Sequence, residues 1–303
     1  MKARNERLEV FLLTYNRAAF LTQTLENLCR QNVGRFPVTV LDNGSTDNTP
    51  QVVENFRDFG VQLKRNDKNV SAAENFARAQ ELAVREWVLV FHDDDLLHPD
   101  YLNTALALAE KYPDAVLAGS GMSFEEHPSP DSWPRCQGDH VCCPQTQDFA
   151  ALLYEGFPFH FGSALYRTEF FKTQQIKWEV YGKVADRPFL LDIARNGSVI
   201  VLKEAYVKYR CHPGQDSAEN YSGPFPEQLF ALHKTYLQLL GADPSTSYGR
   251  VFIQHNYTYL VQEYSRLPDS GMTLEEYLHR AVMAGASTPE AVNTGRIINS
   301  FGE

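Results

Sequence analysis

The sequence predicts a mainly parallel α/β sheet with helices on both faces, followed by a helical extension. Short apolar runs of β character alternate with segments of helical periodicity through most of the chain. Clusters of polar residues follow four consecutive predicted strands, and beyond about residue 220 the apolar spacing is helical only. We therefore expect one α/β domain over residues 1–218 and a helical extension over residues 219–303.

The strands expected in the first half are short apolar runs, which are Leu8–Leu13, Val38–Leu41, Val61–Lys64, Trp87–Phe91 and Ala115–Leu117. Between them, apolar residues recur at helical spacing. Leu21, Leu25 and Leu28 mark the first helix, and Pro50 opens a second that extends to Phe59. Two more helices are expected over Ser71–Arg85 and Asp100–Lys111. Strands that alternate with helices in this way form parallel sheets.

The second half is less regular. Residues 122–146 contain prolines, cysteines and acidic residues, and we expect a long surface loop there. The ordered segments expected after it are Asp148–Tyr154, Ser163–Tyr166, a helix over Asp186–Arg195, and strands at Ser198–Leu202 and Ala205–Tyr209. Residues 214–226 are rich in glycine, proline and serine, as linkers are. The extension beyond them carries aromatic residues at helical spacing, which are Tyr236, Phe252, Tyr257, Tyr259 and Tyr264.

Composition excludes several classes of protein. The 303 residues carry a formal net charge of −10 and no cluster of lysine and arginine, so a nucleic-acid partner is not expected. No apolar run reaches the roughly 20 residues of a membrane-spanning helix. The N-terminus is not of the secretory type, which favours the cytoplasm. Cys136, Cys142 and Cys143 lie near Asp139 and His140, but they lack paired C-x₂-C arms, so we expect reduced thiols rather than a zinc site.

Polar clusters follow the first four predicted strands. They are Thr14–Arg17, Asp42–Ser45, Asn66–Asn69 and His92–Asp95. Ligands of an open parallel sheet bind beyond the carboxyl ends of its strands. The four clusters therefore outline one binding site.

Each cluster also has an ordinary structural explanation. Tyr15 is either a rim aromatic or a surface on which a nucleobase stacks. Asp42 lies in a good turn sequence, and it could equally bind a base or a ribose hydroxyl. Asn69 and Asn75 flank a helix start, where capping is common. Asp93–Asp95 is hardest to explain structurally, because three adjacent carboxylates repel one another unless a hard divalent cation binds them.

The chain has no glycine-rich phosphate loop: neither G-x-x-x-x-G-K-[ST] nor G-x-G-x-x-G follows a strand. Backbone amides are therefore not expected to bind the phosphates of a nucleotide. A cation on the aspartate run can do so instead, since a metal held by carboxylates bridges and neutralises a diphosphate.

These segments resemble the inverting GT-A glycosyltransferases of family 2, which include many bacterial polysaccharide-assembly enzymes. The resemblance runs from about Val10 to Ser217 and rests on an ordered series of motifs, which are LLTYNR at 12–17, VLDNGSTDNT at 40–49, NVSAAENFARA at 69–79, VFHDDDLLHPDYL at 90–102 and YRCHPGQDS at 209–217. It implies a GT-A fold with a donor half, about residues 1–120, and an acceptor half, about residues 121–218.

The resemblance also implies the activity. The expected donor is a nucleotide sugar, with UDP favoured, and the expected cofactor is Mn²⁺ or Mg²⁺. The acceptor would be a glycan or a lipid-linked glycan, as in the synthesis of bacterial O-antigen or capsule. This favours a cytoplasmic protein that works at the inner face of the membrane, with peripheral membrane contact as one role for the helical extension; the oligomeric state is left open.

Carried over residue by residue, the resemblance implies a donor site made of Thr14, Tyr15, Arg17, Asp42, Asn69, Asn75, Asp93 and Arg210. The family's usual D-x-D-D pattern, aligned on Pro99, has an aspartate where this chain has His92. Asp94 is then the first choice as metal ligand and Asp95 the second, while Asp93 faces the ribose or the sugar. His92 is either a hydrogen-bonding substitute or a strand-end histidine with a structural role.

Three further residues receive roles from the resemblance. Asp186, at the start of a predicted helix, is the expected general base, with helix capping as the alternative. His212 is expected to reach the metal or the diphosphate, and Arg210 the phosphates, although a strand-end pair explains both equally well. His160 precedes the strand that faces the acceptor and is the candidate acceptor residue.

Two rival functions share the fold. A sugar nucleotidyltransferase would need a glycine-rich basic loop after the first strand, and LLTYNRAAF contains none. A non-catalytic donor-binding subunit would not need both the aspartate run and Asp186.

Overall fold

The computed structural model describes residues 5–215, 225–240, 264–265, 272–274 and 276–277. The chain divides into two compact units, each made of several segments. The first unit contains residues 1–142, 158–174 and 196–213, and the second contains residues 143–157, 175–195 and 214–303. The predicted domain boundary at residue 218 lies outside the described residues and stays a prediction.

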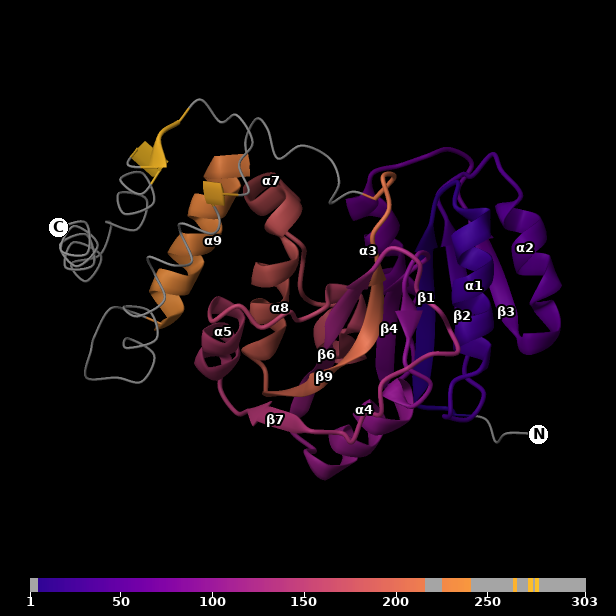
Figure 1. Ribbon diagram of the computed structural model, residues 1–303, viewed down its shortest axis with the longest axis horizontal. Coiled ribbons are helices and arrows are strands. Elements are labelled where there is room, and N and C mark those ends of the chain that lie inside the picture. Colours follow the sequence, from indigo (N-terminus) through magenta and orange to yellow (C-terminus); the bar gives the residue numbers. More distant parts are fainter. Residues whose placement is uncertain (1–4, 216–224, 241–263, 266–271, 275, 278–303) are drawn as a thin grey trace. The chain divides into compact units, whose positions relative to one another are not determined.

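A nine-stranded sheet organises the first unit (Figure 1). Its strands are β1 (Leu8–Thr14), β2 (Val38–Asp42), β3 (Val61–Arg65), β4 (Trp87–His92), β5 (Leu96–Leu97), β6 (Ala115–Glu125), β7 (His140–Cys143), β8 (Leu165–Arg167) and β9 (Ser198–Arg210). The spatial order is β3-β2-β1-β4-β8-β6-β9-β5, and β7 pairs with β9. β3, β2, β1 and β4 are mutually parallel, β8 is antiparallel to both of its neighbours, and β9 runs parallel to β6. The predicted mainly parallel sheet is confirmed.

Helices cover both faces of this sheet, as predicted. They are α1 (Ala18–Cys29), α2 (Thr49–Asn55), α3 (Ala72–Leu82) and α4 (Tyr101–Lys111). One buried cluster joins α1 and α4 to the even-numbered side chains of β1, such as Val10 and Leu12. Phe11 is buried but points away from that cluster, toward the face where α3 contacts β1 and β2. Burial of both faces explains why β1 and β4 are almost continuously apolar.

The helix expected to extend to Phe59 is shorter than predicted. α2 ends at Asn55, and a separate 3₁₀ turn, η1 (Arg57–Phe59), follows it. Gly60 ends that turn with a φ of 87°, a left-handed conformation that glycine adopts without a Cβ clash. The apolar spacing through Phe59 continues across this break, so periodicity alone did not reveal it.

The strands in the second half of the described chain are longer than predicted. β6 extends through Glu125 and β7 forms at residues 140–143, so the loop expected over residues 122–146 is partly strand. The two strands expected at 198–202 and 205–209 are one strand, β9, interrupted by a bulge at Lys203 and Glu204. The Glu204 carboxylate there accepts hydrogen bonds from the backbone N–H groups of residues 137–139, at 2.6, 2.8 and 3.1 Å. Pairing between distant segments, which local sequence does not encode, extends both strands.

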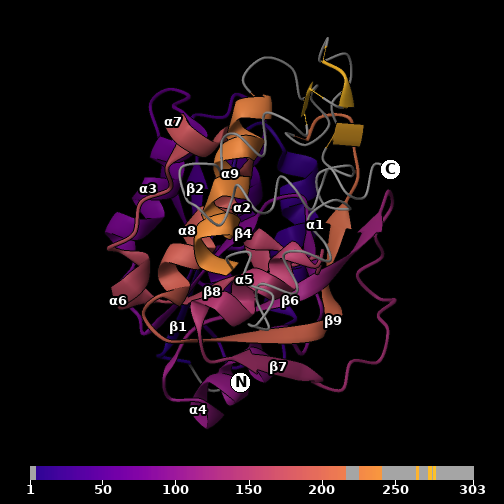
Figure 2. The same ribbon diagram turned by 90° about the vertical axis from the view of Figure 1, so that its left-hand side faces the viewer.

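The second unit is helical in its described part. Its helices are α5 (Thr146–Tyr154), α7 (Trp178–Tyr181), α8 (Asp186–Ala194) and α9 (Phe225–Leu240), with a 3₁₀ turn, η3 (Gly182–Val184). α5, α7 and α8 all contact α9 (Figure 2). Tyr154 and Tyr236 are both buried, with ring centroids 5.1 Å apart. Phe252, Tyr257 and Tyr259 of the predicted extension lie outside the described residues.

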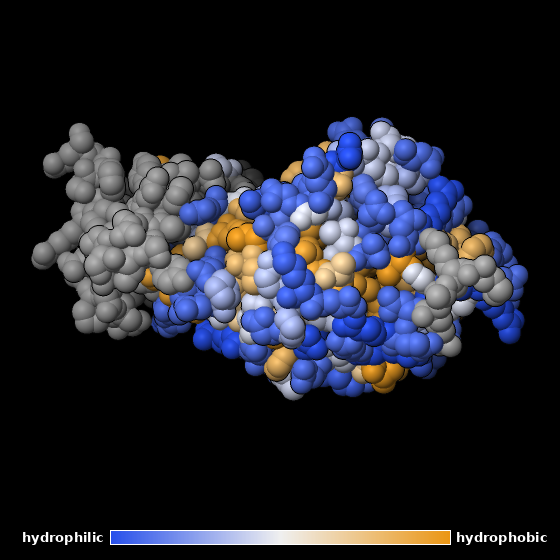
Figure 3. Space-filling model, turned by 90° about the horizontal axis from the view of Figure 1, so that it is seen from below, coloured by the Kyte–Doolittle hydropathy of each residue, from blue (hydrophilic) through white to orange (hydrophobic). Residues whose placement is uncertain are grey.

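No helix in the described part of the chain combines the length and apolar character needed to cross a membrane. Figure 3 shows hydrophilic side chains over much of one face of the described residues, with small hydrophobic patches between them. All five cysteines are free thiols.

Candidate active site

The carboxyl ends of β1, β2 and β4 bring three of the predicted polar clusters to one edge of the sheet. In the parallel registers, Thr14 lies beside Asp42, and Leu13 lies beside His92. Each strand therefore delivers its cluster at the same level. This geometry follows from the parallel pairing itself and places the candidate site at the edge where such sheets bind ligands.

Asp42 is the last residue of β2 and is followed directly by a turn. Its side chain is completely buried, and its Oδ1 accepts a 2.9 Å hydrogen bond from the Ser45 backbone N–H. Arg65, the last residue of β3, places its Nε 3.3 Å from Asp42 Oδ2. Gly44 in the same turn has a φ of 79°, and a Cβ on it would lie 2.7 Å from the Lys68 carbonyl carbon. The turn and the segment after β3 are thus in direct contact.

Asn43 connects that turn to the segment before α3. Its Nδ2 donates to Asn69 Oδ1 at 2.6 Å and to the Val70 carbonyl oxygen at 2.8 Å, and its Oδ1 accepts from the Val70 N–H at 2.9 Å. Asn69 therefore lies against the Asp42 turn through Asn43. The capping alternative for Asn69 and Asn75 is wrong, because Ser71 caps α3.

Asn75 lies inside α3, where it is buried. Its Nδ2 donates to the Leu41 carbonyl oxygen at 3.2 Å, and its Oδ1 accepts from Arg78 Nη1 at 2.8 Å. These contacts hold α3 against the end of β2. Asn75 therefore lies beside the Asp42 turn, as expected for a residue of the donor site.

The segment after β1 supplies both a buried and an exposed side chain. Thr14 is buried, whereas the Tyr15 side chain is 41% exposed at the rim, as a nucleobase platform requires. Asn16 adopts a φ of 52°, and its Oδ1 accepts a 2.7 Å hydrogen bond from the Thr46 N–H. The turns after β1 and β2 are therefore bonded to each other.

Arg17 and His212 converge on Asp94. Arg17 Nη1 lies 2.8 Å from Asp94 Oδ2 and 3.2 Å from Asp93 Oδ1, and His212 Nε2 lies 3.0 Å from the same Asp94 oxygen. Burial and the neighbouring Asp94 charge raise the pKa of Asp93 to about 6, against the lowering effect of Arg17. The repulsion inherent in the aspartate run is thus partly relieved by Arg17. Three predicted site residues, Arg17, Asp94 and His212, meet at one oxygen.

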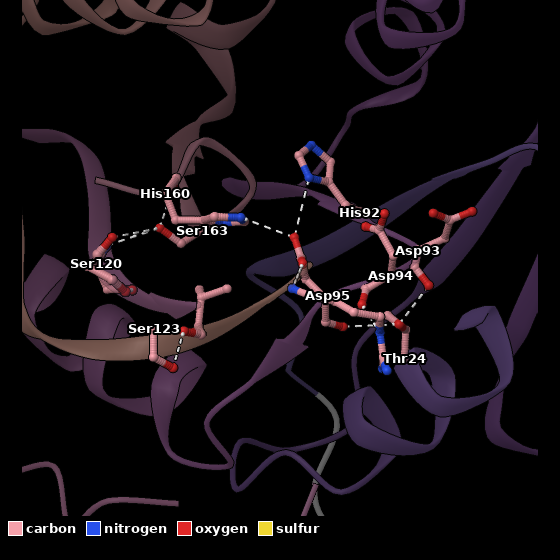
Figure 4. Close-up of polar contacts among 12 residues, drawn as sticks. Thr24, His92, Asp93, Asp94, Asp95, Ser120, Ser123, His160 and Ser163 are labelled. Carbon is pink, nitrogen blue, oxygen red and sulfur yellow. Dashed lines mark hydrogen bonds and ion pairs between the residues drawn. The ribbon is translucent and has the colours of Figure 1, made fainter. Parts of the chain in front are cut away.

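Asp95 points to different partners (Figure 4). Its Oδ2 lies 3.1 Å from His160 Nε2 and 3.5 Å from His92 Nδ1, and its Oδ1 accepts a 2.9 Å hydrogen bond from the Arg210 backbone N–H. Burial would raise the pKa of Asp95, but the two histidines hold it well below its usual range. Burial would lower the pKa of His92, but Asp95 and then the other two aspartates raise it to about 9.

The described residues contain two groups of potential cation ligands. Asp94 and His212, which contact each other, present an imidazole nitrogen and a carboxylate oxygen, and the carboxylate is the ligand that suits Mn²⁺. His92, Asp95 and His160 present one ligand atom each, all within 4.8 Å of one another. A Cβ on Gly162 would lie 2.9 Å from the His160 ring and 3.4 Å from His92 Nδ1, so the glycine leaves room beside both rings.

Several contacts that the sequence did not predict hold the aspartate run in place. Thr24 Oγ1, on α1, donates to the carbonyl oxygens of Asp93 and Asp95 at 2.9 and 3.0 Å. Arg210 Nε donates to the Asp94 carbonyl oxygen at 2.7 Å, and its guanidinium lies over the Phe20 ring. Thr24 carries a usable signal, since it is a polar residue on the buried face of α1.

Asp186 belongs to the second unit, where it is the first residue of α8. Ala185 holds the N-cap position, and no side chain caps the helix. The capping alternative for Asp186 is therefore wrong. Its carboxylate is 28% exposed and lies 3.8 Å from Arg187 Nε.

Comparison with known proteins identifies the family of this chain. The sequence model for Glycosyl transferase family 2 matches residues 9–174, more than half of the chain. The chain belongs to glycosyltransferase family 2. An uncharacterised glycosyltransferase of Haemophilus influenzae is 30% identical over 122 residues, which are 40% of this chain and 38% of that protein. The chain thus aligns with less than half the length of the first curated relatives it matches.

Solved structures show the fold of this family 2 chain. Staphylococcus aureus TarS, residues 1–349, superposes with a TM-score of 0.63 at 19% identity, covering 98% of this chain and 91% of that one. The mannosyltransferase PcManGT of Pyrobaculum calidifontis superposes with a TM-score of 0.52 at 18% identity, over 98% and 80% of the two chains. At these identities the likeness establishes a GT-A-type fold, as predicted. TarS has been solved with UDP-GlcNAc, and PcManGT with GDP-Man and Mn²⁺.

Proposed function

We propose that this chain transfers a sugar, with inversion, from a nucleoside-diphosphate sugar to a hydroxyl group of a glycan or glycolipid acceptor. UDP is the favoured nucleotide, and bacterial surface polysaccharide such as O-antigen or capsule is the proposed product. The observation that carries the proposal is the convergence of Arg17, His212 and Asp94 at the strand edge that also holds the buried Asp42 turn. The nucleotide sugars bound by TarS and PcManGT support it.

The donor is proposed to bind across the ends of β1, β2 and β4. Asp42 accepts from the base or the ribose, and Tyr15 stacks on the base. Asn69 and Asn75 support this pocket through their contacts with the Asp42 turn. Thr14, which is buried beside Asp42, lies at the bottom of the pocket. Asp93 accepts from a ribose or sugar hydroxyl.

The diphosphate is proposed to lie beside Asp94. Asp94 and His212 would hold Mn²⁺ or Mg²⁺, which when bound neutralises the negative charge of the departing diphosphate. Arg17 supplies a second positive charge next to it, and guanidinium groups pair well with phosphate oxygens. Arg210 holds the Asp94 backbone in position through the hydrogen bond from its Nε to the Asp94 carbonyl oxygen.

Asp186 is the proposed general base. As the acceptor oxygen attacks C1 of the donor sugar, the C1–O bond to the diphosphate breaks, and the hydroxyl proton passes to the Asp186 carboxylate. The products are the glycosylated acceptor and a nucleoside diphosphate. The position of this partly exposed carboxylate, at the first residue of α8, supports this role.

The decisive experiment is an assay for nucleoside diphosphate released from a panel of nucleotide sugars with MnCl₂. We expect release with glycan acceptors, and a loss of at least about 10³-fold in Asp94→Ala and Asp186→Asn, since each removes a group that acts on the reacting atoms. Asp131→Asn is the matched control, because its carboxylate is exposed and pairs only at the surface with Arg30. Release of pyrophosphate would indicate a nucleotidyltransferase, and donor binding without turnover on any acceptor would indicate a non-catalytic subunit.

Metal binding to the protein alone distinguishes the two cation arrangements. We expect Mn²⁺ binding, followed by electron paramagnetic resonance, to be lost in Asp94→Ala and weakened in His212→Ala. His160→Ala should retain it. Loss in His160→Ala with retention in Asp94→Ala would assign the cation to His92, Asp95 and His160 instead.

A further inference from the structure

The ends of β6 and β9 lie at the same edge of the sheet as the candidate donor site. β8 is antiparallel to β4, and β6 is antiparallel to β8, so β6 points in the same direction as β4. β9 is parallel to β6, and Phe124 and Tyr209 are partners in that register. Both residues are one position from the carboxyl end of their strand. The topology thus places this cross-strand pair at the ligand-binding edge.

A series of edge-to-face ring contacts leads from this pair to the aspartate run. The Phe124 and Tyr209 centroids are 5.5 Å apart, those of Tyr209 and His160 are 5.7 Å apart, and those of His160 and His92 are also 5.7 Å apart. The interplanar angles lie between 65° and 71°. Both histidines contact Asp95. The rings therefore connect the centre of the site to the surface without a break.

Phe124 is the outer member of this series, and its side chain is 62% exposed. A single exposed aromatic is common in proteins, so exposure alone would mean little. Here the strand that carries the ring is held firmly. Ser123 Oγ donates to Glu125 Oε1 at 3.2 Å, and Lys208 Nζ lies 3.4 Å from Glu125 Oε2. Because alternate residues face opposite sides, these contacts fix the strand while leaving the Phe124 face open.

We propose that Phe124 and Tyr209 form a platform that binds a pyranose ring of the acceptor; this inference rests on the proposed glycosyl transfer. A pyranose has a face of C–H groups that packs on an aromatic ring, while its hydroxyl groups remain available to polar partners. His92, whose side chain is 37% exposed, lies toward the inner end of the platform and supplies such a partner. The residues proposed to bind the base and ribose are on β1, β2 and their turns, at the other side of the site, so we assign the platform to the acceptor.

The test compares Phe124→Ala with Phe59→Ala, a matched control whose ring is 53% exposed and lies in η1, next to β3 at the opposite end of the sheet order. Phe124→Ala should raise the KM for a glycan acceptor about tenfold, the loss typical of one aromatic packing contact. The donor KM, kcat and acceptor-free hydrolysis of the donor should remain at wild-type values. Phe124→Trp should restore the acceptor KM, and Phe59→Ala should leave it unchanged.

A second measurement does not depend on turnover. Saturation-transfer NMR with methyl glucoside, methyl galactoside and methyl N-acetylglucosaminide reports contact between protein rings and sugar C–H protons. We expect at least one glycoside to give a signal that Phe124→Ala abolishes and Phe124→Trp retains. No Phe124-dependent signal, or an unchanged acceptor KM in Phe124→Ala, overturns the platform even where sugar transfer is confirmed. Failure of transfer with a Phe124-dependent glycoside signal would overturn the proposed function and leave the platform standing.

Discussion

The two halves of the sheet in the first unit hold their site residues by different means. In the donor-side half, which comprises β1–β4 and their loops, the contacts around Asp42 join neighbouring turns: Ser45 bonds Asp42 three residues away, and Asn43 bonds Val70 27 residues away. In the acceptor-side half, which comprises β6, β8 and β9, the contacts join distant segments. The Arg210 N–H reaches Asp95 across 115 residues, and Gly138 reaches Glu204 across 66. Short sequence motifs therefore predict many of the contacts in the first half, but few of those in the second half.

Asp95 is where the two halves meet, so its removal should have the largest effect on stability. Asp95→Ala leaves the buried His160 ring and the Arg210 N–H without their carboxylate partner. Breaking a buried charged network of this kind costs about 3–5 kcal/mol in the free energy of unfolding. Urea unfolding at pH 7, followed by circular dichroism, measures the change.

The control for Asp95→Ala is Asp131→Ala, an exposed carboxylate with one surface ion pair. It should alter the free energy of unfolding by no more than about 0.5 kcal/mol. A loss below about 1 kcal/mol for Asp95→Ala would contradict the assignment of Asp95 as the junction between the two halves.

Much of the donor-side half could be predicted from the sequence, because its signals are local. The apolar runs of β1, β2, β3 and β4 and the polar clusters behind them appear in single stretches of chain. Parallel pairing then brings the clusters together without further information.

The acceptor-side half could not be predicted in the same way. Phe124 lies in the segment for which the sequence predicts a loop, and it is part of a strand because it pairs with Tyr209 of β9. Likewise, Asp95 carries no sign that it faces His160 while the adjacent Asp94 faces His212. Which way consecutive side chains turn depends on partners that come from far along the chain.

A second prediction concerns the close approach of two donor-side turns. Gly44→Ala places a Cβ 2.7 Å from the Lys68 carbonyl carbon at a positive φ, and backbone atoms cannot move aside easily. Gly60→Ala is the matched control, since Gly60 also has a positive φ but no atom within 4 Å of an added Cβ. Gly60→Ala should cost about 1–2 kcal/mol for its conformation alone, and Gly44→Ala should cost at least about 1 kcal/mol more.

Binding of UDP, measured by calorimetry, complements the unfolding experiment for this pair. Gly44→Ala should weaken binding, because the Asp42 turn must shift, whereas Gly60→Ala should not. Equal stability and equal UDP affinity in the two variants would mean that the Gly44 contact does not position the turn.

The smallest expected effect belongs to a wholly local device, the capping box of α3. Ser71 Oγ accepts from the Glu74 N–H at 3.2 Å, and Glu74 Oε2 accepts from the Ser71 N–H at 2.9 Å. Ser71→Ala should cost about 1 kcal/mol in the free energy of unfolding at pH 7. Hydrogen bonds from Ser71 hold the pKa of Glu74 below its ordinary value of 4.5.

Because the folded-state pKa of Glu74 is the lower one, its contribution to stability is fully present above pH 4.5 and decreases as the pH falls through the folded value. The difference in unfolding free energy between wild type and Ser71→Ala should therefore narrow below pH 4.5. Ser129→Ala, which removes an exposed serine outside any helix start, should show no such narrowing.

Hydrogen exchange should place the Ser71→Ala effect in α3 alone, as expected for a locally held element, whereas Asp95→Ala should raise exchange in β4, β8 and β9 together. A Ser71→Ala effect that spread into β9 would show that the donor-side half is not held locally.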